Sequence, residues 1–176
     1  QAIEDAGIGF FGPSASVIRR AGAKDEAKKL ARSLENAVIP GIDDISSRAL
    51  IARVKDQKGL EKLAGEHGLD FEFDAARTPE ENAEDLLQLG YSSSLELVTI
   101  EELQRAGERE SAEIWSQYPG KRIRFKCIGG GGGKGQRVVS EPDEIDGAVM
   151  EILAEQKVTE PGSNRNFLIE LNLETT

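Results

Sequence analysis

One stretch of the chain concentrates residue types that could bind a phosphate group. Six of the seven residues from 129 to 135 are glycine, and the seventh is Lys134. Glycine carries no Cβ, so the main-chain N–H groups of such a loop can wrap closely around an anion. Lys126 and Arg137 flank the run and can offset the charge of a phosphate. A flexible linker is the alternative, but linkers usually mix glycine with serine and are not bounded by two strands.

This loop differs from two common nucleotide-binding motifs. A Walker loop has a Gly-Lys pair followed by serine or threonine, whereas Gly135 and Gln136 stand after Lys134 here. A dinucleotide-binding fingerprint leads into a helix, whereas the residues from Gln136 to Val139 predict a strand. The residues therefore favour phosphate binding by a loop of another kind.

The elements that must position this loop can be read from the hydrophobic pattern. Residues 121–128 (KRIRFKCI) alternate between charged and apolar side chains, which predicts a half-buried strand. With the return strand, residues 121–139 form a predicted β-hairpin. An amphipathic helix is predicted over 141–156, and then a strand over 166–173. On that last strand Glu170 and Asn172 should face one way, and Phe167, Ile169, Leu171 and Leu173 the other.

The residues before position 42 predict a helix end, a strand and two helices. Residues 1–6 predict the end of a helix, and the apolar run from Ile8 to Phe11 predicts a buried strand. Ser14 is a candidate N-cap for a helix that follows it. A second helix is predicted over 25–36. Residues 38–41 predict a short extended piece that ends in a Pro-Gly turn.

The middle of the chain is acidic and predicts mainly helices. Residues 41–120 contain 18 Asp and Glu and 8 Lys and Arg, while the rest of the chain has 14 of each sign. Two helix starts have clear signals, Thr78 followed by Pro79 and Thr99 followed by Glu102. A short edge strand is expected at residues 71–73. The acidic excess argues against a general nucleic-acid-binding surface, which would be basic.

Length and composition narrow the class of protein further. The chain has 176 residues, a net charge of -10 and a single cysteine, Cys127, so no disulfide can form within it. This fits a cytoplasmic location. No apolar run approaches the roughly 18 residues that a membrane-spanning helix needs. We therefore expect an α/β or α+β protein that does not span a membrane.

Three stretches together resemble one enzyme family. The string KCIGGGGGKGQRVV, from Lys126 to Val139, looks like the ATP-binding glycine-rich loop of the biotin carboxylases. These are ATP-grasp enzymes, found in acetyl-CoA, propionyl-CoA and pyruvate carboxylases. The stretch from Gly9 to Gly41 is similar to the family's passage from its N-terminal domain, and NFLIE from Asn166 to Glu170 is similar to its hinge strand. The resemblance covers about 100 of the 176 residues.

The resemblance implies roles for particular residues. Lys24 and Lys126 match lysines that contact nucleotide phosphates, and Glu170 matches the hinge residue beside the adenine. The lid loop that closes over the phosphates corresponds to Gly129, Gly130, Gly131, Gly132, Gly133, Lys134 and Gly135. The family's catalytic residues and magnesium ligands correspond to positions after Thr176, so the resemblance assigns no catalytic residue and no metal ligand to this chain.

The resemblance also implies an organisation in three parts. Residues 1–41 would be the end of a pre-ATP-grasp domain and a linker, and residues 121–176 an ATP-grasp lid subdomain with its hinge strand. Residues 42–120 would be an acidic, mostly helical insertion. That insertion is a candidate for contacts within a homo-oligomer, and a solvated appendage is the alternative. Leu171, where the family has a lysine, and the pair Cys127-Ile128 depart from the family pattern.

The implied function is that of a fragment of a larger enzyme. The parent would use ATP, Mg²⁺ and bicarbonate to carboxylate biotin, together with a biotin carrier domain and a carboxyltransferase. The fragment alone is expected to bind ATP weakly or not at all and to catalyse nothing. One alternative is another ATP-grasp ligase, such as a carbamoyl-phosphate synthetase. The other is a non-catalytic interaction module that uses the acidic helices.

Overall fold

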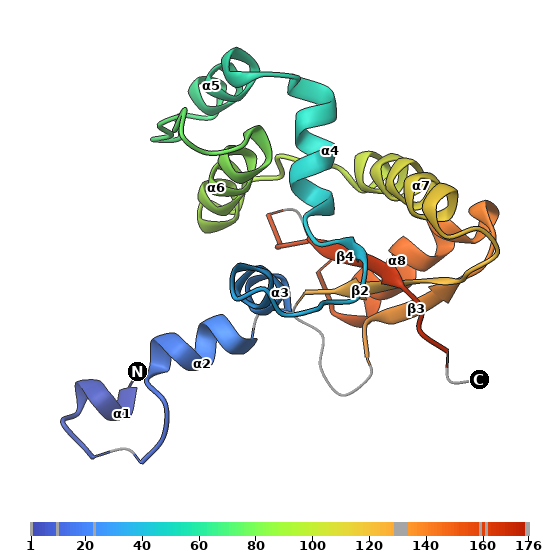
Figure 1. Ribbon diagram of the computed structural model, residues 1–176. Coiled ribbons are helices and arrows are strands. Elements are labelled where there is room, and N and C mark those ends of the chain that lie inside the picture. The colour runs from blue at the N-terminus through green and yellow to red at the C-terminus, as the bar shows by residue number, and fades with distance from the viewer. Residues whose placement is uncertain are drawn as a thin grey trace. The chain divides into compact units, whose positions relative to one another are not determined.

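The structure is a computed structural model that describes residues 2–9, 11–22, 24–128, 134–158, 160 and 162–174. The chain divides into two compact units, residues 1–38 and residues 39–176. Figure 1 labels their helices and strands in chain order.

The first unit is helical in its described part, with α1 (Ala2–Asp5), α2 (Ala15–Gly22) and α3 (Lys24–Ser33). Ser14 caps α2 as predicted, because its Oγ accepts a hydrogen bond of 3.4 Å from the N–H of Val17. The strand predicted at residues 8–11 is wrong. Ile8, Gly9 and Phe11 lie outside any strand, and the side chain of Phe11 is fully exposed. The described residues of this unit offer no second strand, so the apolar run has no partner for a ladder.

The second unit contains the predicted acidic helices. They are α4 (Ile45–Val54), α5 (Gln57–Glu66), α6 (Pro79–Ser92) and α7 (Ile100–Gln117). Both predicted helix starts are confirmed as capping boxes. The hydroxyl of Thr78 accepts from the N–H of Glu81, and that of Thr99 accepts from the N–H of Glu102. Each glutamate carboxylate accepts in return from the N–H of its threonine, so two helix-end donors are satisfied at each start.

The sheet of this unit has four strands among the described residues, in the order β1-β4-β2-β3, and every pair is antiparallel. The strands are β1 (Gly41–Ile42), β2 (Ile123–Cys127), β3 (Gln136–Val139) and β4 (Phe167–Leu171). The predicted hairpin is confirmed by the pairing of β2 with β3. The predicted Pro-Gly turn is wrong, since Gly41 begins a strand that pairs with β4. The described residues 71–73 form no strand.

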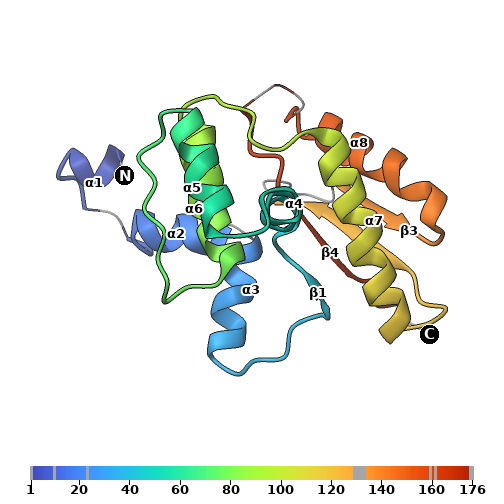
Figure 2. The same cartoon turned by 90° about the horizontal axis from the view of Figure 1, so that it is seen from above.

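Two helices cover one face of the sheet. Helix α8 (Ile145–Glu155) follows a short 3₁₀ turn (Pro142–Glu144) and contacts β2 and β3, while α7 contacts β4 and α8. Figure 2 shows α7 and α8 side by side along the strands. The rings of Phe125 and Phe167 stack beneath them with centroids 5.6 Å apart. Because α4 packs on both α6 and α7, the acidic helices share one hydrophobic core with the sheet. The architecture is therefore a mixed α+β one.

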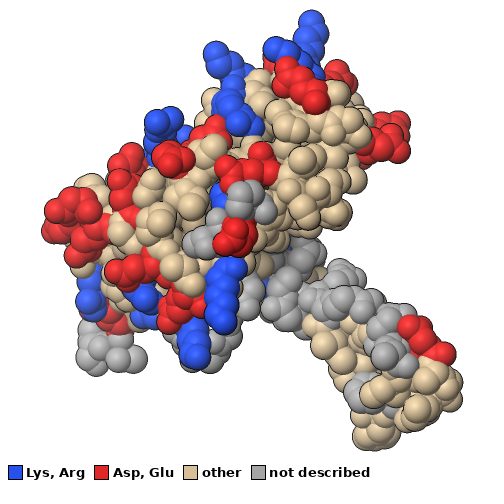
Figure 3. Space-filling view, turned by 180° about the vertical axis from the view of Figure 1, so that it is seen from behind, with Lys and Arg blue, Asp and Glu red and all other residues tan. Residues whose placement is uncertain are grey.

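The surface of the unit 39–176 agrees with the sequence prediction except at one residue after β4. Phe167, Ile169 and Leu171 face the core as expected, but Leu173 lies beyond the strand and is 65% exposed. On the face of unit 39–176 drawn in Figure 3, acidic and basic side chains are interspersed, so this face presents no continuous basic surface. Among the described residues, no helix combines the length and apolar character needed to cross a membrane.

Candidate functional site

The face of the sheet opposite α7 and α8 carries polar side chains in neighbouring strands. Strand alternation and register place Arg124 and Lys126 of β2 on this face, beside Gln136 of β3 and Glu170 of β4. Asn172, two residues after Glu170, continues the same row. We call these five residues the polar sheet face. The sequence predicted two of its members, Lys126 and Glu170, as site residues.

Lys126 and Glu170 form an ion pair across strands β2 and β4. Lys126 lies directly opposite Leu168 in the register, so its ammonium group reaches diagonally to the carboxylate. Glu170 is only 5% exposed, while the side chain of Lys126 keeps 26% of its surface. The arrangement holds a cation next to the strand end where the glycine run begins. Glu170 is thus a buried and paired residue, not an exposed one.

Gly41 allows the edge strand β1 to lie close to Glu170. A Cβ at position 41 would stand 2.3 Å from the carbonyl oxygen of Ile169 and 2.7 Å from the Cα of Glu170. Contacts this short do not occur between real atoms, so the position requires glycine. The close approach of β1 therefore helps to fix the main chain that carries Glu170.

Arg124 makes three hydrogen bonds, and all of them go to side-chain amide oxygens. Its Nε and Nη2 donate to Oδ1 of Asn172 at 3.0 and 2.7 Å, and its Nη1 donates to Oε1 of Gln136 at 2.9 Å. Asn172 is 7% exposed and also donates to Glu174 at 3.3 Å. The sequence analysis did not single out Arg124, Gln136 or Asn172. The alternation of charged and apolar residues in 121–128 was the signal that could have found the arginine.

The end of the glycine run is anchored to helix α8. The N–H of Gly135 donates a 2.8 Å hydrogen bond to Oε2 of Glu155, which also accepts from Nη1 of Arg137 at 3.0 Å. The Gly135 N–H lowers the pKa of the Glu155 carboxyl from its ordinary value, and Arg137 and Lys134 lower it further. Gly135 has a φ of +66°, which favours glycine. Sequence reasoning missed Glu155, because a helix residue gives no local sign of the loop it contacts.

The remaining predicted site residues belong to the other unit, lie outside the described residues or are exposed. Gly129 to Gly133 fall outside the described residues. Lys134 is described and exposed. Lys24 is the first residue of α3 in the unit 1–38, whereas Lys126 and Glu170 belong to the unit 39–176. The structure thus brings together Lys126, Glu170 and the Gly135 end of the loop on one hairpin and its neighbouring strand.

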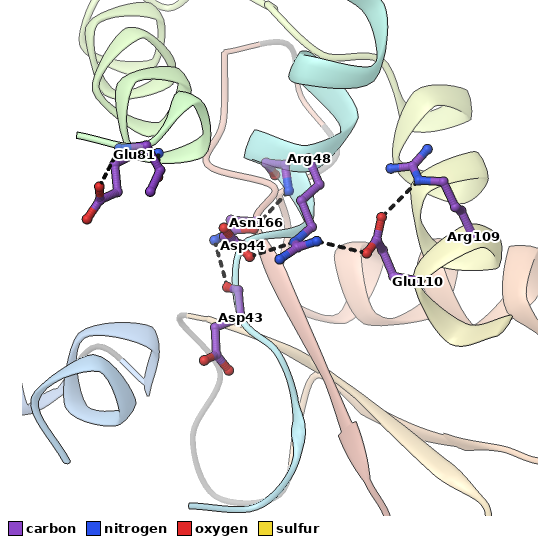
Figure 4. Close-up of polar contacts among 9 residues, drawn as sticks. Asp43, Asp44, Arg48, Glu81, Arg109, Glu110 and Asn166 are labelled. Atoms are coloured by element: carbon purple, nitrogen blue, oxygen red, sulfur yellow. Dashed lines mark hydrogen bonds and ion pairs between the residues drawn. The ribbon is translucent and has the colours of Figure 1, made fainter. Parts of the chain in front are cut away.

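A second polar cluster lies at the start of α4, and its contacts are those of a structural network. Figure 4 shows Arg48 between Asp44 of the same helix start and Glu110 of α7, and Arg109 on the far side of Glu110. Asn166, just before β4, accepts from the N–H of Ser46 at 3.1 Å and donates to the carbonyl of Asp43 at 3.4 Å. These bonds join α4, α7 and β4, so the cluster fixes the helices over the end of the sheet.

The described part of the chain also has a pocket away from the polar sheet face. An open pocket of about 360 Å³ is lined by Trp115, Lys121, Arg122 and Glu141, among others. It lies at the other end of the β2–β3 hairpin from the glycine run. No group of three or more His, Cys, Asp or Glu is arranged to hold a metal ion among the described residues. Cys127 is buried, as the alternation predicts.

The polar sheet face places two basic side chains next to the predicted phosphate-binding loop. Lys126 and Arg124 supply positive charge in a chain whose net charge is -10. A scan against protein-family models and a search of curated proteins each found no match to this chain.

Proposed function

We propose that this chain is part of a biotin-dependent carboxylase and contributes the glycine-rich phosphate lid and part of the ATP site. The parent enzyme would use ATP and bicarbonate to carboxylate biotin. The observation that carries the proposal is the Lys126–Glu170 pair on the polar sheet face, next to the hairpin that carries the glycine run. Both residues match positions of the biotin carboxylase pattern, and the antiparallel hairpin with its neighbouring strand fits an ATP-grasp lid.

The chemistry assigned to this part is binding and charge neutralisation. The side chain of Lys126 is partly exposed. Its ammonium group would contact phosphate oxygens and offset charge that develops during phosphoryl transfer. Until a phosphate arrives, Glu170 keeps that ammonium group in place. The main-chain N–H groups of the glycine run would surround the phosphates and exclude water. Mg²⁺ would supply further charge neutralisation when bound, and the resemblance assigns its ligands to positions after Thr176.

The test is ATP-dependent fixation of bicarbonate onto free biotin by the longer protein that the proposal requires, continuing past Thr176. We expect activity in that protein and its loss when Lys126 is replaced by alanine. Lys121→Ala is the matched control, since Lys121 is exposed before the start of β2, away from the glycine run. This control should leave the rate unchanged.

Each other result points to a different function. Tight ATP binding without bicarbonate fixation would favour another ATP-grasp ligase. No ATP binding, or a rate that Lys126→Ala leaves intact, would contradict the proposal and favour an interaction module.

A further inference from the structure

An open pocket lies where strands β2 and β3 part, at the end of the hairpin away from the glycine run. The ladder of the two strands ends at the pair Ile123–Val139. Beyond that pair, residues 121–122 and residues 140–142 line the pocket, and Trp115 from the last turn of α7 lines it as well. The volume of about 360 Å³ is at the small end of the range for ligand pockets, so it suits a molecule of the size of one amino acid.

The indole of Trp115 gives this pocket an apolar wall in a fixed orientation. Its Nε1–H donates a 2.9 Å hydrogen bond to the carbonyl of Lys121, and its ring packs partly against the hydrophobic core. The polar atom of the ring is therefore occupied, and the ring offers a ligand its π-surface. Aromatic rings pack on such a surface in offset or edge-to-face arrangements, and Pro142 adds a second apolar group. These two residues favour a ligand with an aromatic ring.

The pocket also carries one available charge of each sign. Continuing the register past the last pair of the ladder places Lys121 across from Glu141. Both side chains are exposed, and they form no ion pair with each other or with any other described residue. Arg122, the third charged residue of the lining, pairs with Glu174 at 2.6 Å. Lys121 is thus available to a carboxylate, and Glu141 is available to an ammonium group.

We propose that this pocket binds a free aromatic α-amino acid. Such a molecule carries an ammonium and a carboxylate group on one carbon atom and an aromatic ring one carbon farther on. Lys121 would bind the carboxylate and Glu141 the ammonium group, while the ring would pack on Trp115. A simple anion would instead meet Glu141 as a like charge. The site is independent of the proposed function, so Lys121→Ala remains a control in the bicarbonate assay, which contains no amino acid.

The experiment uses the fluorescence of Trp115, the only tryptophan of the 176-residue chain. The probes are L-phenylalanine, 3-phenylpropionate, which lacks the ammonium group, and 2-phenylethylamine, which lacks the carboxylate. L-Phenylalanine should change the fluorescence saturably, and each analogue should bind about tenfold more weakly, because it loses one hydrogen-bonded charge pair. Equal affinities for the three probes, or no saturable change with L-phenylalanine, would overturn the proposal.

Variants of the two charged residues test the assigned contacts. Lys121→Ala should weaken L-phenylalanine binding about tenfold without weakening the binding of 2-phenylethylamine, which has no carboxylate to lose. Glu141→Ala should weaken L-phenylalanine binding to a similar extent without weakening that of 3-phenylpropionate. Lys62→Ala, on an exposed lysine of α5, is the control and should change no affinity. Variants that bind L-phenylalanine as tightly as the unsubstituted protein would contradict the proposed contacts.

A spectroscopic measurement on the unsubstituted protein makes the test independent of how the variants fold. L-Phenylalanine should shift the NMR signal of the Trp115 indole N–H through the ring current of the bound side chain. L-Alanine, which has both charges and no ring, should shift this signal much less. An indole signal that L-phenylalanine leaves in place would overturn the proposal.

Discussion

The N–H of Gly135 and the carboxylate of Glu155 are joined by a 2.8 Å hydrogen bond between the start of β3 and the last residue of α8. The same carboxylate oxygen accepts from Arg137, while Glu151, one helical turn earlier, pairs with Arg137 only. One acidic side chain thus occupies a main-chain donor at the end of the glycine run. A phosphate at that end of the loop would compete with Glu155 for the donor.

Replacing Glu155 by alanine should free the Gly135 amide. A hydrogen bond to a charged carboxylate protects an amide from exchange with solvent, so exchange of this amide hydrogen should speed up roughly tenfold or more. Amide hydrogen exchange followed by NMR measures it directly. Glu151→Ala is the matched control, because it removes the other partner of Arg137 without touching Gly135. Equal exchange rates in the two variants would show that Glu155 does not hold the loop.

Acid should break the same bond. The pKa of Glu155 is lowered from 4.5 by the Gly135 N–H, so the carboxylate stays charged at neutral pH. A carboxyl whose pKa is lowered in the folded state stabilises that state at any pH above its ordinary pKa. This stabilisation is lost as the pH falls through the lowered pKa. We therefore expect the Gly135 amide shift to titrate below pH 4.5. If the titration step is missing in Glu155→Gln, the step belongs to the Glu155 carboxyl.

Gly41→Ala should separate β1 from β4. The new Cβ would meet the main chain of Ile169 and Glu170 at 2.3 and 2.7 Å, so the strands must move apart at a cost of roughly 1–3 kcal/mol. Urea denaturation measures the free energy of unfolding. Gly147→Ala is a control of opposite sign, because no atom lies within 4 Å of its Cβ and alanine favours the helix. A Gly41 variant as stable as the parent would contradict the close approach.

Loss of Glu110 should destabilise the network at the start of α4. Its side chain is 6% exposed and pairs with both Arg48 and Arg109. Glu110→Ala removes both ion pairs and leaves Arg48 with Asp44 alone, at a cost of about 2 kcal/mol. Glu66→Ala removes an exposed ion pair with Lys62 and should change stability by less than about 0.5 kcal/mol. Chemical denaturation of both variants gives the comparison. Similar losses in the free energy of unfolding for the two variants would mean that burial of Glu110 does not strengthen its ion pairs.

Local sequence signals predicted the local elements well. The capping threonines Thr78 and Thr99 were identified because a helix start depends on residues within one turn. The β2–β3 hairpin followed from period-two alternation on both sides of the glycine run. These features depend only on residues close in sequence, so they could be predicted from the local sequence.

Features that depend on distant partners were missed or wrong. The run at Ile8–Phe11 has strand propensity but no partner strand in the described part of its unit. Gly41 was assigned to a turn, because its pairing with Glu170 depends on residues far along the chain. Glu155 and Asn172 acquire their roles only when α8 and β4 come to lie beside the hairpin. For Lys126 and Glu170 the structure supplies proximity, and their contact with ATP stays a prediction.

The strand order β1-β4-β2-β3 has a consequence for how the unit 39–176 folds. Of the four described strands β4 comes last in sequence, yet it lies between β1 and β2. Neither neighbour completes its ladder until residues 167–171 have been synthesised. Contacts between residues so far apart in sequence slow folding, because a long loop must close before they form. During synthesis on the ribosome, the sheet-facing apolar side chains of α4 to α7 would therefore remain exposed until β4 is made. Completion of this sheet should be a late event that depends on the arrival of β4.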